Sequence, residues 1–229
     1  MRLVRSLGLL SFIAVIAFCA LPVRAEMINA DGAAFDLQMP KGYCTMSRTH
    51  DKEKGHYELQ DRMQKDVNAV LLMAVACEDV EDMRAGKPWK QWMIWLLNGK
   101  PGQHIRIPAG MSRADVVREL AVAMPSLDMG MVKNKIDETA GQEGLQFKLR
   151  NMSVIAKDDD ALYTAQTVAV AAGGADAREI AVVTGWAALN QHIVTLNMYS
   201  GYKDAASIDT LQARTKDALM RTIAATAEK

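Results

Sequence analysis

Residues 162–199 read LYTAQTVAVAAGGADAREIAVVTGWAALNQHIVTLNMY, and this stretch decides the fold of the chain. It contains three apolar runs rich in β-branched residues, 162–170, 180–189 and 193–199, separated by short turn-like segments. Such short connections join antiparallel neighbours, because a parallel crossover needs about a dozen residues or more. The stretch therefore predicts an antiparallel meander of three strands.

The segments on either side of the meander extend the sheet and cover it. Residues 145–155 begin with apolar side chains that alternate with polar ones, which predicts a fourth strand. After the meander, apolar side chains recur at helical spacing, which predicts a closing helix with one buried face. These side chains are Ile208, Leu211, Leu219 and Ile223.

The first half of the chain is predicted to mix strands and helices. Residues 35–39 alternate apolar and polar side chains up to a Pro-Lys-Gly turn, and residues 69–77 are continuously apolar, as in a buried strand. Helices are expected over residues 51–65, 88–98 and 112–124, the second starting at a proline and the third at a capping box.

The order of these elements predicts an α+β fold, an antiparallel β-sheet flanked by helices. The sequence shows no internal repeat, low-complexity tract or long linker. We therefore expect residues 26–229 to form a single α+β domain.

Residues 1–25 have the pattern of a signal peptide, with a basic start and an apolar run of about a dozen residues. The apolar run, residues 7–19, is too short to span a bilayer. Val23 and Ala25 stand at the −3 and −1 positions of a cleavage before Glu26. A compact signal led by arginine is typical of bacteria, so we predict a periplasmic or secreted protein.

Composition and charge exclude several classes of protein. The chain has 229 residues, of which 50% are hydrophobic and 24% charged, unlike a disordered chain. Residues 1–25 contain three arginines and no acidic residue, so their removal changes the formal net charge from 0 to −3. This charge disfavours binding to nucleic acid or to anionic lipid. No later segment is long and apolar enough to predict a transmembrane helix.

Two of the three cysteines remain after the signal peptide is removed, Cys44 and Cys77. Lipoprotein processing at the third, Cys19, is disfavoured by the bulky Phe18 before it. In an oxidising compartment two cysteines favour a disulfide, and this one would close a loop of about 34 residues, worth roughly 3–4 kcal/mol. The alternative is a thiol nucleophile with a nearby histidine as its base, and the sequence leaves it open.

Other candidate chemistry has a structural interpretation. The histidines, at positions 50, 56, 104 and 192, show no zinc-ligand spacing and are interpreted as lone surface residues. The run Asp158-Asp159-Asp160 lacks the alternating ligands of a calcium loop and is interpreted as a solvated turn. A methionine cluster at positions 124, 129 and 131 raises a copper(I) site, but methionine commonly fills irregular cores. We therefore predict no catalytic residue, metal or cofactor.

The most unusual stretch is WKQWMIWLL, residues 89–97, which holds three of the four tryptophans. As a helix it would be apolar over far more than the usual stripe of about 100°. Such a helix is either buried on nearly all sides or presents part of itself to a partner. Trp89, Trp92 and Trp95 are therefore the candidate binding residues, and the expected partner is a protein or an apolar ligand.

Two segments give the chain a family resemblance. FDLQMPKGY, residues 35–43, and VTLNMYSGYKDAASIDTLQARTKDAL, residues 194–219, resemble the PsbP-like α/β/α sandwich superfamily. In that superfamily a proline–glycine–aromatic turn follows the first long strand, and a final strand leads through a tyrosine- or serine-containing loop into a C-terminal helix. The resemblance implies an extrinsic or periplasmic binding or assembly protein without a shared active site.

These observations predict an exported, non-catalytic binding or assembly module of the periplasm. The alternative is a periplasmic hydrolase or thiol enzyme whose site is assembled only in the fold. A pocket that joins Cys44, His50 or His56 and a carboxylate would favour the enzyme, whereas a Cys44–Cys77 bridge would favour the binding module.

Overall fold

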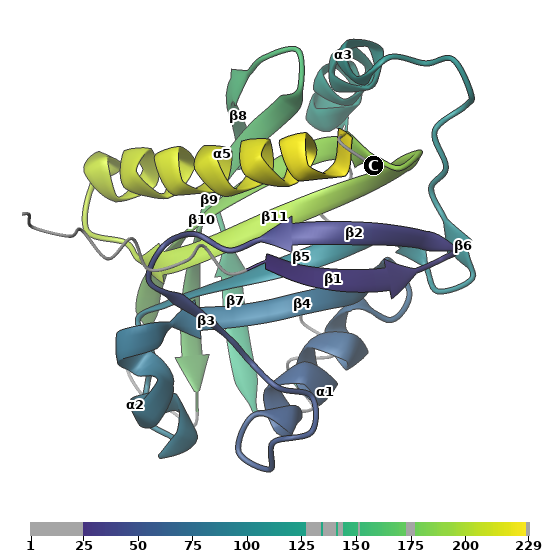
Figure 1. Ribbon diagram of the computed structural model, residues 1–229. Coiled ribbons are helices and arrows are strands. Elements are labelled where there is room, and N and C mark those ends of the chain that lie inside the picture. The colour runs from purple at the N-terminus through teal and green to yellow at the C-terminus, as the bar shows by residue number, and fades with distance from the viewer. Residues whose placement is uncertain are drawn as a thin grey trace, which may run out of the picture.

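The computed structural model describes residues 25–126, 134, 141, 144–150, 152–172 and 177–227. In this part of the chain an antiparallel sheet lies between two layers, with the long helix α5 and the hairpin β1–β2 on one face and shorter helices on the other (Figure 1). The predicted α+β class is therefore confirmed. The predicted signal peptide, apart from Ala25, lies outside the described residues.

The strands of the main sheet pair in an order that differs from their order in the sequence. From one edge to the other the order is β3 (Tyr43–Thr45), β4 (Asn68–Ala76), β5 (Gln91–Lys100), β11 (His192–Gly201), β10 (Arg178–Leu189), β9 (Ala161–Ala172) and β7 (Leu145–Leu149). The short strand β6 (Gln103–His104) pairs with β5, and β8 (Ser153–Lys157) pairs with β9.

The predicted meander is present as β9, β10 and β11, each antiparallel to the next. A two-residue turn, Asn190-Gln191, joins β10 to β11, and Leu189 pairs with His192 beside it. The predicted strand 145–155 is instead two strands, β7 and β8. The first strand ends at Leu149, and both strands pair with β9. The predicted glycine turn at 173–174 lies outside the described residues.

The helix predicted over 88–98 is wrong, because this segment forms strand β5. Both faces of β5 are buried, so its apolar side chains run without the alternation that marks a half-exposed strand. Periodicity cannot separate such a run from a buried helix. A proline at the start, which suits the first turn of a helix, lies here in the loop before the strand.

The other predicted elements of the first half are present. Strand β2 (Ala33–Gln38) ends before the Pro-Lys-Gly turn, and helix α1 (Lys54–Gln64) falls within the predicted range. Ser112 caps α3 (Arg113–Ala123) through the predicted capping box with Asp115. The sequence patterns did not predict β1 (Ala25–Ala30), the short strands β3 and β6, or the short helix α2 (Val80–Arg84).

The main core lies between the sheet and the layer formed by α5 (Ala205–Ala227) and the β1–β2 hairpin. Helix α5 approaches the sheet closely at Gly185 on β10. A Cβ atom there would lie 2.9 Å from Leu219 Cδ2 and 3.0 Å from Thr215 Cγ2, so glycine permits this packing. On the opposite face, Tyr57 of α1 and Met83 of α2 cover a second apolar cluster of β4 and β5.

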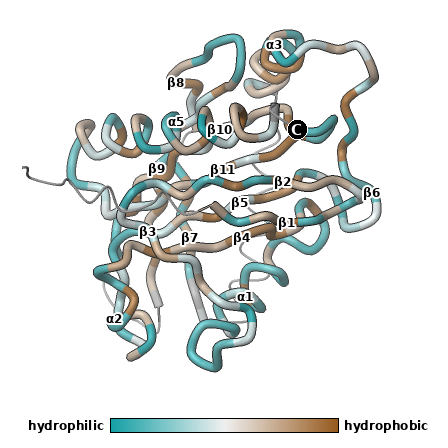
Figure 2. Tube along the Cα trace, viewed as in Figure 1, coloured by the Kyte–Doolittle hydropathy of each residue, from teal (hydrophilic) through white to brown (hydrophobic). Residues whose placement is uncertain are grey.

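Figure 2 shows the hydrophobic residues concentrated along the strands, whereas α1 is largely hydrophilic, as expected for a helix with one buried face. Within the described part of the chain, no helix is long and apolar enough to cross a membrane.

Candidate functional site

Strand β5 sends the three predicted binding residues to different places. Trp95 has no exposed surface and packs in the main core. Trp92 lies on the opposite face of the sheet, because side chains alternate along a strand, and Trp89 stands in the loop just before β5. Both remain partly exposed. Since Trp95 is enclosed, only Trp89 and Trp92 stay candidates for contact with a partner.

Trp89 and Trp92 belong to a row of four neighbouring rings, which we call the aromatic strip (His56, Trp89, Trp92 and Tyr199). The ring centroids are 4.7 Å apart for His56 and Trp89, and 5.5 Å for Trp89 and Trp92. Trp92 and Tyr199 occupy paired positions of β5 and β11, and their rings are 4.7 Å apart and nearly parallel, at 4°. The aromatic strip therefore joins α1, the loop before β5 and two strands of the sheet.

Burial in this row changes the titration of its two polar rings. Burial raises the pKa of Tyr199 to about 12, although a hydrogen bond with Asn197 acts in the other direction. Burial likewise lowers the pKa of His56, against the attraction of Glu53. Both shifts favour the neutral ring, so the aromatic strip is uncharged at neutral pH.

Two buried carboxylates fix the backbone around the aromatic strip. Asp79, which is 1% exposed, accepts a hydrogen bond of 2.8 Å from the backbone N–H of Lys90 at the start of β5. Glu53, which is 2% exposed, pairs with Arg84 of α2 at 2.7 Å. Burial alone would raise the pKa of Glu53, but the Ser47 N–H and the Arg84 guanidinium outweigh it and hold the pKa below its ordinary value. These contacts hold α1, α2 and the tryptophan loop together.

The predicted disulfide joins Cys44 of β3 to Cys77 directly after β4, with the Cα atoms 4.9 Å apart. The alternative of a Cys44 nucleophile loses its thiol to this bond. The proposed bases are also committed elsewhere, because His50 lies 3.7 Å from Glu53 and the His56 ring packs against Trp89 at a tilt of 43°. The residues of the predicted thiol site therefore do not form one.

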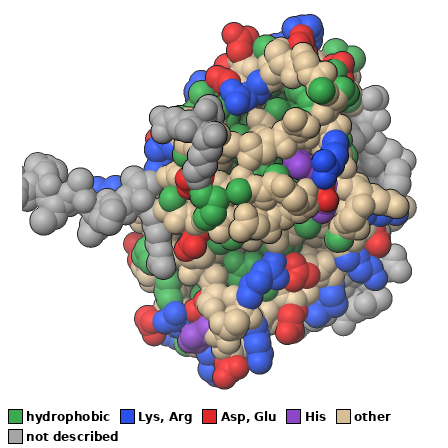
Figure 3. All heavy atoms as spheres, turned by 45° about the vertical axis from the view of Figure 1, so that its right-hand side comes forward, with side chains coloured by type: hydrophobic (Ala, Val, Ile, Leu, Met, Phe, Trp, Pro, Cys, Tyr) green, Lys and Arg blue, Asp and Glu red, His purple; other side chains and the backbone are tan. Residues whose placement is uncertain are grey.

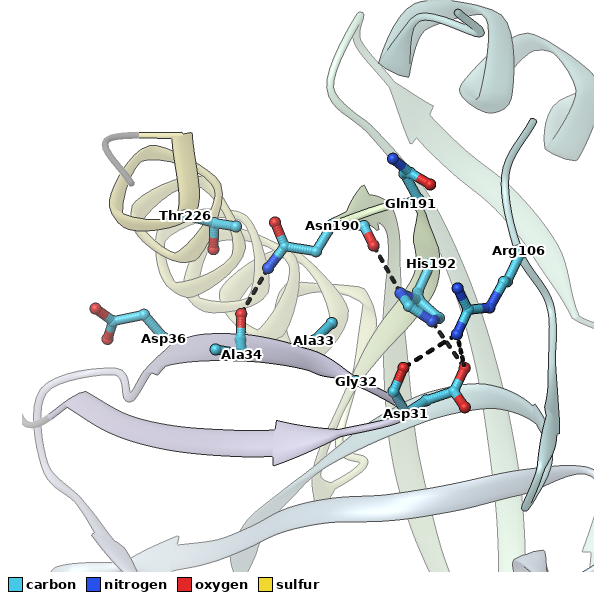
Figure 4. A pocket seen from close by; sticks show the side chains of 10 residues that line it. All are labelled: Asp31, Gly32, Ala33, Ala34, Asp36, Arg106, Asn190, Gln191, His192 and Thr226. Carbon is cyan, nitrogen blue, oxygen red and sulfur yellow. Dashed lines mark hydrogen bonds and ion pairs between the residues drawn. The ribbon is translucent and has the colours of Figure 1, made fainter. Parts of the chain in front are cut away.

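A second feature, which the sequence analysis missed, is a pocket between the tips of two hairpins. The turn Asp31-Gly32 of β1–β2 and the turn Asn190-Gln191 of β10–β11 line an open hollow of about 570 Å³. Arg106, from the extended segment after β6, forms its side wall (Figure 4). Figure 3 shows histidines among basic and acidic side chains at this end of the molecule. We call this feature the hairpin-turn pocket (Asp31 to Ala34, Asp36, Arg106, Asn190 to His192, and Thr226).

His192 and Asp31 form the floor of the hairpin-turn pocket. The interpretation of His192 as a surface residue is wrong, because it is only 2% exposed. Its Nε2 lies 3.0 Å from Asp31 Oδ2, and its Nδ1 lies 2.7 Å from the carbonyl oxygen of Asn190. Arg106 Nη2 donates to the same Asp31 oxygen at 3.1 Å. The His192 hydrogen bond, and secondarily Arg106, hold the pKa of Asp31 below its ordinary value.

The remaining candidates for chemistry are engaged in structural contacts or lie elsewhere. Asp158 accepts hydrogen bonds from the backbone N–H groups of Asp160 and Ala161 and pairs with Lys216 at 2.9 Å, so it acts as a turn residue. Met124 is buried in a small apolar cluster beside α3, whereas the other two methionines of the suggested cluster, 129 and 131, lie outside the described residues.

The architecture is that of an α+β sandwich. The solution structure of cyanobacterial PsbP (CyanoP) from Synechocystis sp. PCC 6803 aligns with 92% of this chain and 98% of its own, at 9% identity and a TM-score of 0.42. The crystal structure of the Saccharomyces cerevisiae Ran-binding protein Mog1p aligns with 91% of this chain and 95% of its own, at 11% identity and a TM-score of 0.30.

Both TM-scores lie below 0.5, so these likenesses carry no argument about function. No family model matches the chain, and no curated protein matches its sequence. The function is therefore argued from the residues of this chain.

Proposed function

We propose that this chain is an exported, non-catalytic binding or assembly module of the periplasm, and that it contacts a protein or an apolar ligand through the aromatic strip. The observation that carries the proposal is the partial exposure of Trp89 and Trp92, which stack on each other within a row of neighbouring rings. A core tryptophan of this chain, Trp95, is by contrast fully enclosed.

The stacked arrangement suits a contact surface. Tryptophan and tyrosine are enriched in binding hot spots, because they remove much apolar area from water at a small entropic cost. Here each ring is already held by its neighbours, and Asp79 fixes the backbone beside the tryptophans. A surface ordered before binding loses little conformational entropy when a partner docks.

The disulfide supports the proposed compartment. Disulfides persist in oxidising compartments such as the bacterial periplasm and are rare in the cytosol. The Cys44–Cys77 bond also removes the thiol that the enzyme alternative would need. Thr226 is the one hydroxyl side chain in the described lining of the hairpin-turn pocket. Its hydroxyl is already engaged within α5, because it donates to the carbonyl oxygen of Thr222.

The test compares alanine variants of the three tryptophans. Trp89→Ala and Trp92→Ala are expected to keep the fold and to weaken association with a partner captured from the native envelope by about 30-fold, the size of a hot-spot truncation. Trp95→Ala is expected to cost about 3–5 kcal/mol of stability, as for an enclosed aromatic residue.

The matched control is Val122→Ala, a change at an exposed apolar residue on α3, which is expected to alter neither quantity. Thermal unfolding and a titration with the purified partner measure both effects. If Trp89→Ala and Trp92→Ala bind as tightly as the unchanged protein, the aromatic strip is not the contact surface.

A further inference from the structure

We propose that the hairpin-turn pocket is a second binding site, which takes a small carboxylate held by the Arg106 guanidinium and the Gln191 side chain. This site lies apart from the aromatic strip, and the proposal stands on different residues. The volume of about 570 Å³ is that of a small-molecule site.

Backbone strain is concentrated at the rim of this pocket. Among the described residues, three that are not glycine have a positive φ, Asp31 at 50°, Asn190 at 47° and Gln191 at 61°, and all three line the pocket. Aspartate and asparagine tolerate this region in two-residue hairpin turns, but the second turn position favours glycine. Strained residues cluster at functional sites, so a glutamine at this position points to a use for its side chain.

The Gln191 side chain has no other evident role in the fold. It is exposed, and no hydrogen bond to its amide occurs within the part of the chain that the structure describes. Only its backbone is engaged, because its carbonyl oxygen accepts a hydrogen bond of 2.8 Å from the N–H of Ile107. That bond, with the bridge between Arg106 and His192, places Arg106 next to the strained turn.

Arg106 is held in position and still has donors to offer. Its Nη2 donates to the backbone oxygen and to the carboxylate of Asp31, both at 3.1 Å (Figure 4). Its Nε and Nη1 groups have no partner among the described residues, and the side chain is 62% exposed. His192 anchors Asp31 from the buried side, so the guanidinium is positioned by a rigid carboxylate. The free Nε–H and Nη1–H donors lie on different edges of the guanidinium, so a carboxylate here would accept a single charge-assisted hydrogen bond from Arg106.

The charges of the pocket select a carboxylate over a phosphate. Asp31 and Asp36 both line the hollow, so a doubly charged phosphate would be repelled more strongly than a singly charged carboxylate. Thr226 marks the C-terminal turn of α5, where the helix dipole is negative. This end of the hollow also disfavours an anion, so the carboxylate group is expected at the Arg106 end.

The first test is a titration of the full protein with butyrate, a singly charged carboxylate, followed by calorimetry and by NMR chemical shifts. Butyrate is expected to bind saturably with a Kd below about 1 mM. Butyramide, which has the same size without the charge, and inorganic phosphate are each expected to bind at least tenfold more weakly. Equal binding of butyramide, tighter binding of phosphate, or no saturable binding of butyrate would each overturn the proposal.

The second test uses variants that separate binding from folding. Arg106→Gln is expected to weaken butyrate binding at least tenfold, whereas the control Arg118→Gln, at an exposed arginine paired with Asp115 on α3, keeps it. Gln191→Gly is expected to keep or raise the melting temperature, because glycine relieves the strained φ, while weakening butyrate binding several-fold. Wild-type affinity in both pocket variants would refute the site, and it would leave the proposal for the aromatic strip unchanged.

Discussion

Replacing both cysteines of the disulfide with alanine is expected to lower the free energy of unfolding by about 4 kcal/mol. The bond joins residues 33 positions apart, and a closed loop of about 34 residues removes roughly 12–13 cal/mol/K of entropy from the unfolded chain. Cys77 is exposed and Cys44 partly exposed, so replacing them with alanine removes little packing. Most of the expected loss therefore comes from the entropy that the unfolded chain regains when the loop is no longer closed.

Urea denaturation of Cys44→Ala/Cys77→Ala measures this loss directly, and the melting temperature should fall by about 8–16 °C for a chain of this size. The matched control is the unchanged protein under reducing conditions, which is expected to unfold at the urea concentration of the double variant. A thiol assay on the denatured, non-reduced protein should find essentially no free thiol. A stability loss below about 1 kcal/mol, or two free thiols per chain, would refute the reasoning.

Three further predictions concern the packing and the titrating groups. Gly185→Ala is expected to cost about 1–3 kcal/mol in urea denaturation, because the new Cβ would lie 2.9 Å from Leu219 Cδ2, and an unchanged midpoint would show that α5 shifts freely. The His192 hydrogen bond lowers the pKa of Asp31 in the folded state, so this group adds stability above its ordinary pKa of 3.8, and that stability is lost as the pH falls through the lowered value. Asp31→Asn should therefore flatten the acid side of the stability profile, and an unaltered profile would contradict the pairing. Because burial raises the pKa of Tyr199 to about 12, ultraviolet titration of the folded protein and of Tyr199→Phe should coincide up to about pH 11, and a lower signal in the variant would contradict this.

The sequence was sufficient where a local pattern and the tertiary structure agree. The meander followed from short connections, which leave antiparallel pairing as the only geometry. The start of α3 followed from Ser112 and Asp115, whose side chains cap the helix through neighbours three residues apart. In both cases the deciding interactions join residues that are close in the sequence, so a short stretch of sequence is enough to predict them.

The prediction for residues 88–98 was wrong because the environment of strand β5 is set by distant parts of the chain. Trp92 and Ile94 face the layer of α1 and α2, whereas Met93 and Trp95 face the main core. Because both faces of β5 are buried, apolar and polar residues do not alternate along it as they do in a half-exposed strand. The proline before the strand also suited the first turn of a helix. The same argument that identified residues 69–77 as a buried strand applies to this run, and its aromatic content is typical of strands.

The two candidate sites could be predicted only in part. The tryptophans stood out by their density, but Tyr199 enters the aromatic strip only through the pairing of β5 with β11. The hairpin-turn pocket joins Asp31, Arg106 and His192, which are far apart in the sequence. The Asp31-Gly32 dipeptide is a common hairpin turn and could have revealed β1–β2, but it carries no information about which turn lies beside it.

The position of β5 between β4 and β11 has a consequence for how the chain folds. Its partners on one side come from the neighbouring segment, whereas those on the other side lie roughly 100 residues further along the chain. Contacts of such long sequence separation require the closure of a large loop before any stabilisation is gained, which slows folding. Until β11 has been synthesised, β5 presents an open edge that includes Trp92 and Trp95, and an open apolar edge is prone to aggregation. A strand that is paired on both sides in the finished sheet is thus an exposed edge in the unfinished one.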